Sequence, residues 1–165
     1  LIGSMNPEEG RLRPQLMDRF GLRAVVGGLT DVTLRYRAYE QAIAYQHNPE
    51  TFAALYADGT LALAAEIQQA RQLLPQVTIG GAARILGVQL VQSLHIASNR
   101  AEITLFEAAR AYAAADARTE VLPADIQAVA MLALRQRQSP ALEQFFAEQN
   151  QEDALLTAVF AQHQP

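Results

Sequence analysis

Apolar residues recur at helical spacing through most of the chain after Gly28, and this pattern limits the fold more than any other feature of the sequence. One such stripe follows Pro123 and consists of Ile126, Val129, Ala130, Ala133 and Leu134. Residues spaced three and four apart lie on the same face of a helix, whereas a strand would require alternation. The sequence therefore predicts a mainly α-helical fold.

Helix start and stop signals divide the first half of this region. Thr30 or Asp31 can cap a helix, and Asn48 can cap a second one, because a short polar side chain accepts a hydrogen bond from the first free backbone amides. The second helix is predicted to continue until Pro75 stops it, with a kink at Gly59. This second helix carries a narrow apolar stripe, which indicates packing along one side only.

Three further helical regions are predicted in the second half of the chain. One covers residues 82–94, and another begins at Asn99, with Glu102 as its capping-box partner. The face of the Asn99 helix predicted to be buried consists of Ile103, Phe106, Ala109 and Ala113. Beyond the helix that starts at Pro123, residues 139–165 are predicted to form one or two helices carrying Leu142, Phe145, Phe146, Leu155, Leu156, Val159 and Phe160.

The first thirty residues follow a different pattern. Residues 1–5 and 22–26 are short apolar runs and are predicted to be strands, each followed by a turn signal. Pro14 suits the first position of a helix between them, and Gly21 suits the residue just past its end. Strand, helix and strand in this order indicate the end of an α/β unit, so we expect the chain to begin within a domain.

Composition excludes several classes of function. The net charge of −4 offers no basic field for nucleic acid or an anionic membrane. The chain has no cysteine for a thiolate metal site or nucleophile, and no apolar run approaches the ~20 residues that span a bilayer. The histidines lack partners at ligand spacing, so no metal ligand is predicted. No Walker A phosphate loop, G-x-x-x-x-G-K-[ST], occurs in these 165 residues.

Three polar residues lie where a functional side chain could act. Asn6 follows a predicted strand, although Asn-Pro also simply starts a turn. Arg19 ends a predicted short helix, where it could either satisfy the last carbonyls or serve a ligand. Arg100 lies in the first turn of a helix, where the helix dipole disfavours a cation. A bound anion would remove that conflict, and an exposed arginine of little effect is the alternative.

Four segments resemble the ATPase subunit of magnesium chelatase, a member of the AAA+ superfamily. Residues 6–22 read N-P-E-E-G-R-L-R-P-Q-L-M-D-R-F-G-L, close to that family's signature, and residues 73–78, 98–103 and 120–126 resemble later segments in the same order. The chain departs from the family pattern at Gly80-Gly81, where Pro-Asp is usual, and at Ala97-Ser98, where glycine is common.

The resemblance implies roles that spacing does not. It places Asn6 at the sensor-1 position, Arg19 at the arginine finger that reaches the neighbouring subunit's nucleotide, and Arg100 at the sensor-2 position. The implied cofactors are ATP and Mg²⁺, held mainly by Walker A and B segments that the family places before this region. It also implies that residues 1–30 end an ATPase core and 31–76 form a helical insertion. Residues 77–138 would then form a helical lid and 139–165 a helical tail.

The implied function is ATP hydrolysis in a homo-oligomeric ring that drives insertion of Mg²⁺ into protoporphyrin IX for (bacterio)chlorophyll synthesis. The implied partners are an ATPase-like subunit with an integrin-type domain and a large porphyrin-binding subunit, in the cytoplasm or the chloroplast stroma. The 165 residues alone are expected to be inactive because they lack a phosphate cradle. The alternatives are a cobalt chelatase or MoxR-type AAA+ ATPase, and a non-catalytic helical assembly subunit.

Overall fold

The computed structural model describes residues 1–6, 8, 10, 13–137, 144, 148–151 and 153–155. Its helices are α1 (Pro14–Met17), α2 (Val32–His47), α3 (Pro49–Ala54), α4 (Ala57–Leu73), the 3₁₀ turn η2 (Leu74–Gln76), α5 (Gly81–Ser93), α6 (Arg100–Ala115) and α7 (Pro123–Leu134). Two strands of two residues each, β1 (Thr78–Ile79) and β2 (Glu120–Val121), pair in parallel. The predicted mainly α-helical class is confirmed.

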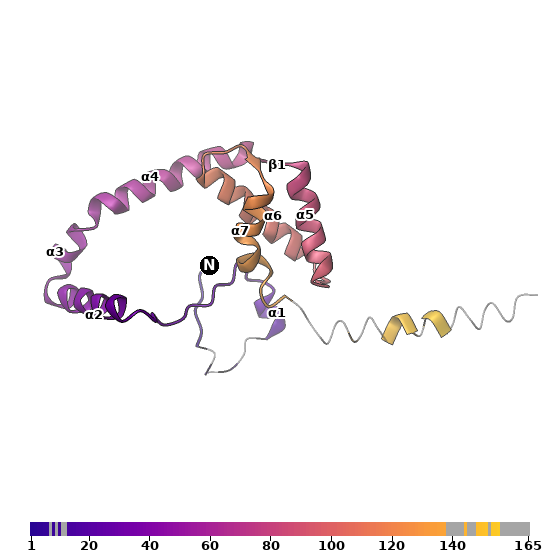
Figure 1. Ribbon diagram of the computed structural model, residues 1–165, viewed down its shortest axis with the longest axis horizontal. Helices are drawn as coiled ribbons and strands as arrows, with labels where there is room; N and C mark the ends of the chain where they lie inside the picture. Colours follow the sequence, from indigo (N-terminus) through magenta and orange to yellow (C-terminus); the bar gives the residue numbers. More distant parts are fainter. Residues whose placement is uncertain are drawn as a thin grey trace, which may run out of the picture.

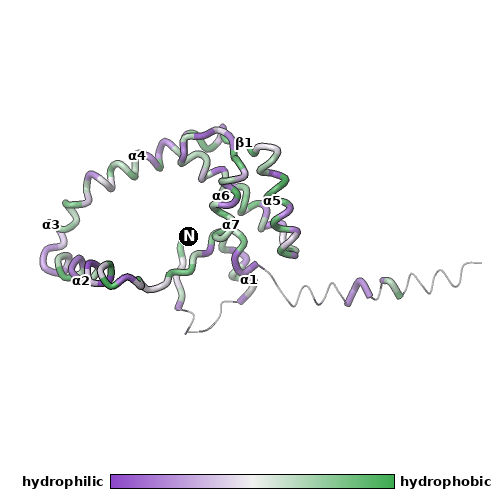
Figure 2. Tube along the Cα trace, in the orientation of Figure 1, coloured by the Kyte–Doolittle hydropathy of each residue, from purple (hydrophilic) through white to green (hydrophobic). Residues whose placement is uncertain are grey.

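The helices form a compact bundle and an extended arm (Figure 1). In the bundle, α6 packs against α5 and α7, and β1 and β2 join the loops before α5 and α7. The arm consists of α2, α3 and α4, which contain no buried residue and return to the bundle where α4 meets α6. Figure 2 shows polar and apolar residues alternating along the arm. In the described part of the chain, no helix is long and apolar enough to cross a membrane.

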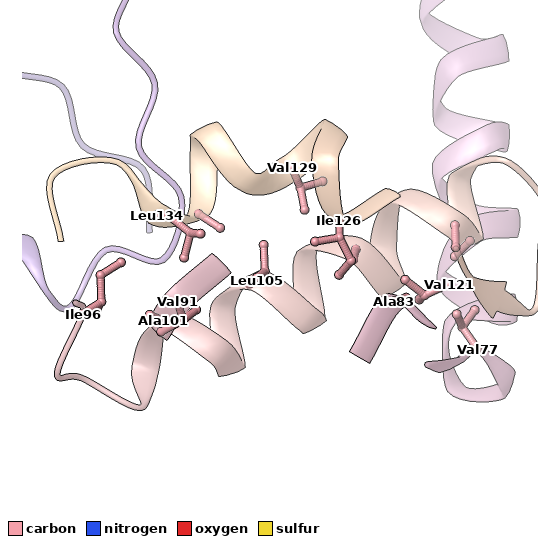
Figure 3. Close-up of a cluster of buried hydrophobic side chains, with 14 residues drawn as sticks. Val77, Ala83, Val91, Ile96, Ala101, Leu105, Val121, Ile126, Val129 and Leu134 are labelled. Carbon is pink, nitrogen blue, oxygen red and sulfur yellow. The ribbon is translucent and has the colours of Figure 1, made fainter. Parts of the chain in front are cut away.

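The hydrophobic core lies between α5, α6 and α7 (Figure 3). Its largest fully buried apolar side chains are Leu105, Ile126, Val91 and Val121. Alanines line much of the rest, and their small side chains allow the helices to approach closely. The predicted stripe on α7 is confirmed: Ile126, Val129, Ala133 and Leu134 are buried and Ala130 packs against them.

The local start signals of the arm helices are confirmed. Asp31 Oδ1 accepts a hydrogen bond from the amide of Leu34 at 2.8 Å, and Asn48 Oδ1 accepts one from the amide of Thr51 at 3.0 Å. The predicted kink at Gly59 is wrong, because the break lies between α3 and α4 and Gly59 is inside α4. Glycine permits a bend but does not impose one.

The predicted strands at residues 1–5 and 22–26 are wrong. Both segments are irregular, and Val26 is 92% exposed. A strand needs a neighbour for its backbone groups, and none lies beside either segment in the part that the structure describes. The amide of Arg23 instead donates to the carbonyl of Leu132 at the end of α7, at 2.8 Å. The helix between the segments is confirmed, although α1 ends at Met17.

Two details of α6 also differ from prediction. The side chain of Asn99 forms no capping bond, and Ser98 Oγ accepts from the amide of Arg100 at 3.4 Å instead. Ile103 is 63% exposed, and Leu105 takes the expected place in the core. Most of the predicted C-terminal tail, including Leu142, Phe145, Phe146, Leu156, Val159 and Phe160, lies outside the described residues.

Candidate functional site

A carboxylate just after α1 joins two arginines from the bundle. Asp18 Oδ2 accepts from Arg100 Nη1 at 3.2 Å, and Asp18 Oδ1 accepts from Arg137 Nη1 at 3.0 Å. The side chain of Arg137 is 1% exposed, whereas that of Arg100 is 60% exposed. We call Asp18, Arg23, Arg100 and Arg137 the Asp18 cluster. It connects the segment that follows α1 to both α6 and the end of α7.

Arg137 also donates to four oxygens besides Asp18. Its Nε bonds the carbonyl of Ala133 at 2.6 Å, in the last turn of α7. Its Nη2 bonds the carbonyl of Gly21 at 2.9 Å, the carbonyl of Phe20 at 3.4 Å and Thr104 Oγ1 at 3.2 Å. A guanidinium has five N–H donors in a fixed planar fork, so these bonds constrain the direction of the chain at residues 20–21.

Arg23 makes the reciprocal connection from the N-terminal segment. Its Nη1 donates to the carbonyls of Arg135 at 2.9 Å and Gln136 at 2.6 Å, just after α7. Its Nη2 donates to the carbonyl of Met17, the last residue of α1. The two segments are thus held together by guanidinium bonds to backbone carbonyls, and charged donors make stronger bonds than neutral ones.

The cluster contains three guanidinium groups and a single carboxylate. Burial lowers the pKa of Arg23, and the nearby charge of Arg137 lowers it further, while Asp18 opposes both effects. Burial likewise lowers the pKa of Arg137, Asp18 raises it, and Arg100 adds a smaller lowering. An arginine pKa starts so high that both groups stay charged at neutral pH. The cluster is therefore electropositive, and its exposed member is Arg100.

Arg19 differs from these arginines. Its side chain is exposed and makes no hydrogen bond or ion pair with any residue that the structure describes. The alternative role at the end of its helix is filled by Arg23, which bonds the last carbonyl of α1. Asp18 and Phe20, the residues on either side of Arg19, are both bonded to Arg137. The Arg19 guanidinium is consequently free to reach a group outside the chain.

The sequence left open whether Arg100 holds a bound anion or is simply exposed; in the structure its side chain is 60% exposed and pairs with the carboxylate of Asp18. Asn6, in contrast, is exposed and forms a local turn: its Oδ1 accepts from the amide of Glu8 at 3.2 Å. The structure joins Arg100 to the segment that carries Arg19, and none of the described contacts joins Asn6 to either.

No group of three or more acidic, histidine or cysteine side chains that could hold a metal ion occurs in the described ranges.

Sequence reasoning did not identify Asp18, Arg23 or the contacts of Arg137 as parts of one site. Asp18 lies 82 residues from Arg100 and 119 residues from Arg137, so no spacing rule relates them. The signal in the sequence that could have pointed to Asp18 is its position directly before Arg19, a candidate functional residue.

The chain is similar to known proteins over most of its length. A family model described as the AAA lid domain matches residues 86–159. Over 137 residues, covering 83% of this chain, the chain is 42% identical to the chloroplastic magnesium-chelatase subunit ChlI of Chlamydomonas reinhardtii and 42% identical to ChlI of Synechocystis. The chain is therefore homologous to part of the magnesium-chelatase subunit ChlI. It spans 33% and 38% of the lengths of those two ChlI proteins.

The chain also shares its fold with a solved structure. The crystal structure of a candidate ATPase from Cytophaga hutchinsonii superposes with a TM-score of 0.56 at 21% identity, and the match covers 78% of this chain and 41% of that one. The described fold is therefore shared with that structure, and residues 86–159 match the AAA lid domain.

Proposed function

We propose that the chain supplies the arginine finger and the sensor-2 lid of a magnesium-chelatase ATPase subunit. The observation that carries this proposal is the 42% identity to two ChlI proteins over 137 residues. The intact protein would form a homo-oligomeric AAA+ ring and act with an ATPase-like subunit containing an integrin-type domain and with a porphyrin-binding subunit. It would insert Mg²⁺ into protoporphyrin IX for (bacterio)chlorophyll synthesis, in the cytoplasm or the chloroplast stroma.

In this proposal Arg19 acts across a subunit boundary. Phosphoryl transfer depends on positioning and on neutralising charge that develops on the phosphate oxygens. A guanidinium presents paired donors to such oxygens. Arg19 is exposed and has no partner among the described residues, so none of these residues has to be displaced before it contacts a neighbour's nucleotide.

Arg100 is proposed to contact a phosphate from the lid, and Asn6 to help place the attacking water. The groups that Arg19 and Arg100 offer are cations, which fit ATP phosphates rather than Mg²⁺. We propose that the Mg²⁺ accompanying ATP is held by Walker-type residues outside the described ranges. The division into core end (1–30), insertion (31–76), lid (77–138) and tail (139–165) belongs to the same proposal.

The test uses the intact protein that carries these residues together with a Walker A loop. We expect Arg19→Ala to lower ATP turnover by about 10³-fold or more, because a missing finger has an effect of this order, while ATP binding changes little. Arg84, an exposed arginine on α5, provides the matched control, and Arg84→Ala should keep normal turnover. Normal turnover by Arg19→Ala would contradict the finger assignment.

Mixed rings test whether Arg19 acts in trans. Arg19→Ala subunits are combined with subunits whose Walker A lysine is replaced, so that each variant alone is inactive. A site between an intact Walker A loop and an intact finger then forms only in the mixture. Restored hydrolysis supports action across the boundary, whereas no restoration in rings shown to contain both variants opposes it.

A further inference from the structure

The bonds of Arg137 fall on both sides of Arg19. Arg137 Nη1 bonds the side chain of Asp18, the residue before Arg19, and Arg137 Nη2 bonds the carbonyls of Phe20 and Gly21, the residues after it. Bonds on both flanks fix the backbone direction at Arg19, and that direction determines where the Arg19 side chain points. Arg137 itself is anchored to α7 through the carbonyl of Ala133.

The two arginines that share Asp18 differ in exposure, and therefore in how easily each can give up its bond to Asp18. In the Arg100–Asp18 pair the Arg100 side chain is 60% exposed and that of Asp18 34%, so water and salt weaken this ion pair. The Arg137 side chain is 1% exposed, and losing its partners would leave a charge buried without compensation. Arg100 can accordingly leave Asp18 for another anion at little cost, while Arg137 stays bonded.

We propose that Arg137 is a positioning residue that holds the Arg19 segment on the lid through Asp18, Phe20 and Gly21. The segment and α7 then move together when the lid moves, and Arg100 exchanges Asp18 for phosphate without releasing the segment. This inference rests on the proposed role of Arg19. The segment also lies against α6, since a Cβ built on Gly21 would be in ordinary contact with Thr104 Cγ2, at 3.4 Å.

The experiment compares Arg137→Gln and Arg137→Lys with the unchanged intact protein. We expect Arg137→Gln to lower kcat for ATP hydrolysis by about 10- to 100-fold, as expected when a reacting group shifts by ~1 Å, with KM changed less than about threefold. Arg137→Lys keeps the charge but not the planar fork, so its kcat should be intermediate. In an Arg19→Ala background, Arg137→Gln should lower kcat no further, because its effect passes through Arg19.

Hydrogen exchange supplies a readout that does not depend on hydrolysis. The amides of residues 17–23, including that of Arg23, should exchange about tenfold faster or more in Arg137→Gln, because the bonds that hold the segment are lost. Arg110 provides a matched control: it bonds the carbonyls of Val77 and Leu74 at 3.0 Å each and pairs with Glu107, away from this segment. Arg110→Gln should leave both kcat and the exchange of residues 17–23 unchanged.

The outcomes separate this inference from the proposed function. Unchanged kcat and unchanged exchange in Arg137→Gln, with Arg19→Ala inactive, would overturn the positioning role alone. If Arg137→Gln lowers kcat by the same factor in the Arg19→Ala background as in the unchanged protein, the positioning role is also overturned. Its effect then does not pass through Arg19 and is structural. If residues 17–23 exchange faster in Arg137→Gln but Arg19→Ala hydrolyses ATP normally, the arginine-finger role of Arg19 is contradicted. The attachment of the segment through Arg137 is then still supported. If Arg137→Gln does not fold, Arg137→Lys decides: reduced kcat with faster exchange supports the role, and normal values in both overturn it.

Discussion

Gly87 lies where α5 packs against Phe106 and Leu105 of α6, and replacing it tests how tightly the bundle is packed. It is buried, and a Cβ added there would lie 2.6 Å from Cε1 and 2.8 Å from Cζ of Phe106, and 3.5 Å from Cδ2 of Leu105. Carbon atoms in ordinary contact are ~3.5–4.0 Å apart. In Gly87→Ala the Phe106 ring or α5 must therefore move by about 1 Å.

Two opposing effects determine the stability of Gly87→Ala. Overpacking a core position destabilises by ~1–3 kcal/mol. Alanine in a helix interior is favoured over glycine by ~0.5–1 kcal/mol. The cost of overpacking exceeds the helix preference of alanine. We therefore expect a net loss of about 1–2 kcal/mol in the free energy of unfolding, or roughly 2–8 °C in Tm for a chain of this size.

Urea unfolding of the 165-residue chain, followed by circular dichroism, measures this change. Gly81→Ala is the control within the same helix, because nothing lies within 4 Å of its added Cβ, and it should change stability by less than ~0.5 kcal/mol. Adding Phe106→Leu to Gly87→Ala should recover about 1 kcal/mol relative to the sum of the two single changes. A Gly87→Ala chain as stable as the original, or more stable, would refute the close-packing argument.

Two further predictions concern the bundle. Hydrogen bonds from Arg118 lower the pKa of the buried Asp125 carboxyl, burial opposes this, and the amide of Leu122 adds to the lowering. The resulting stabilisation is fully present above the pKa of an unfolded aspartate, ~3.9, and is lost as pH falls through the folded pKa. Asp125→Asn should therefore lose stability at pH 7, and in urea melts its difference from the unchanged chain should shrink as pH falls below ~3.9. Leu105→Ala should lower the free energy of unfolding by ~2–5 kcal/mol by calorimetry or urea melts, because Leu105 is fully buried, and a change under ~1 kcal/mol would contradict its place in the core.

The sequence predicted those features that depend on neighbouring residues. Asp31 and Asn48 cap α2 and α3 because each contact spans three residues. The predicted capping box at Asn99 does not form, and the sequence alone does not show why. Asn99 adopts helical angles, φ −59° and ψ −11°, whereas a residue whose side chain caps a helix needs an extended backbone. Ser98 Oγ takes the bond instead.

Features that depend on distant residues could not be predicted in this way. Residues 22–26 have the composition of a strand, but strand formation depends on a neighbour, and in this structure Arg23 pairs with the end of α7. Arg19 and Arg100 were identified by family resemblance, which says nothing of what each one contacts here. That Asp18 holds Arg100 and Arg137 at once follows only from the folded chain.

Hydrophobic packing and guanidinium bonds have different tasks in this fold. The face of α6 inside the bundle is largely alanine, including the fully buried Ala101, Ala109 and Ala113. Apolar burial stabilises the helices against one another but is non-directional, so it cannot by itself fix the orientation of an irregular segment. Residues 18–23 have no strand or helix of their own, and their direction depends on bonds with fixed geometry from Arg23 and Arg137. An exposed arginine in such a segment can point consistently outward only because its neighbours are bonded inward.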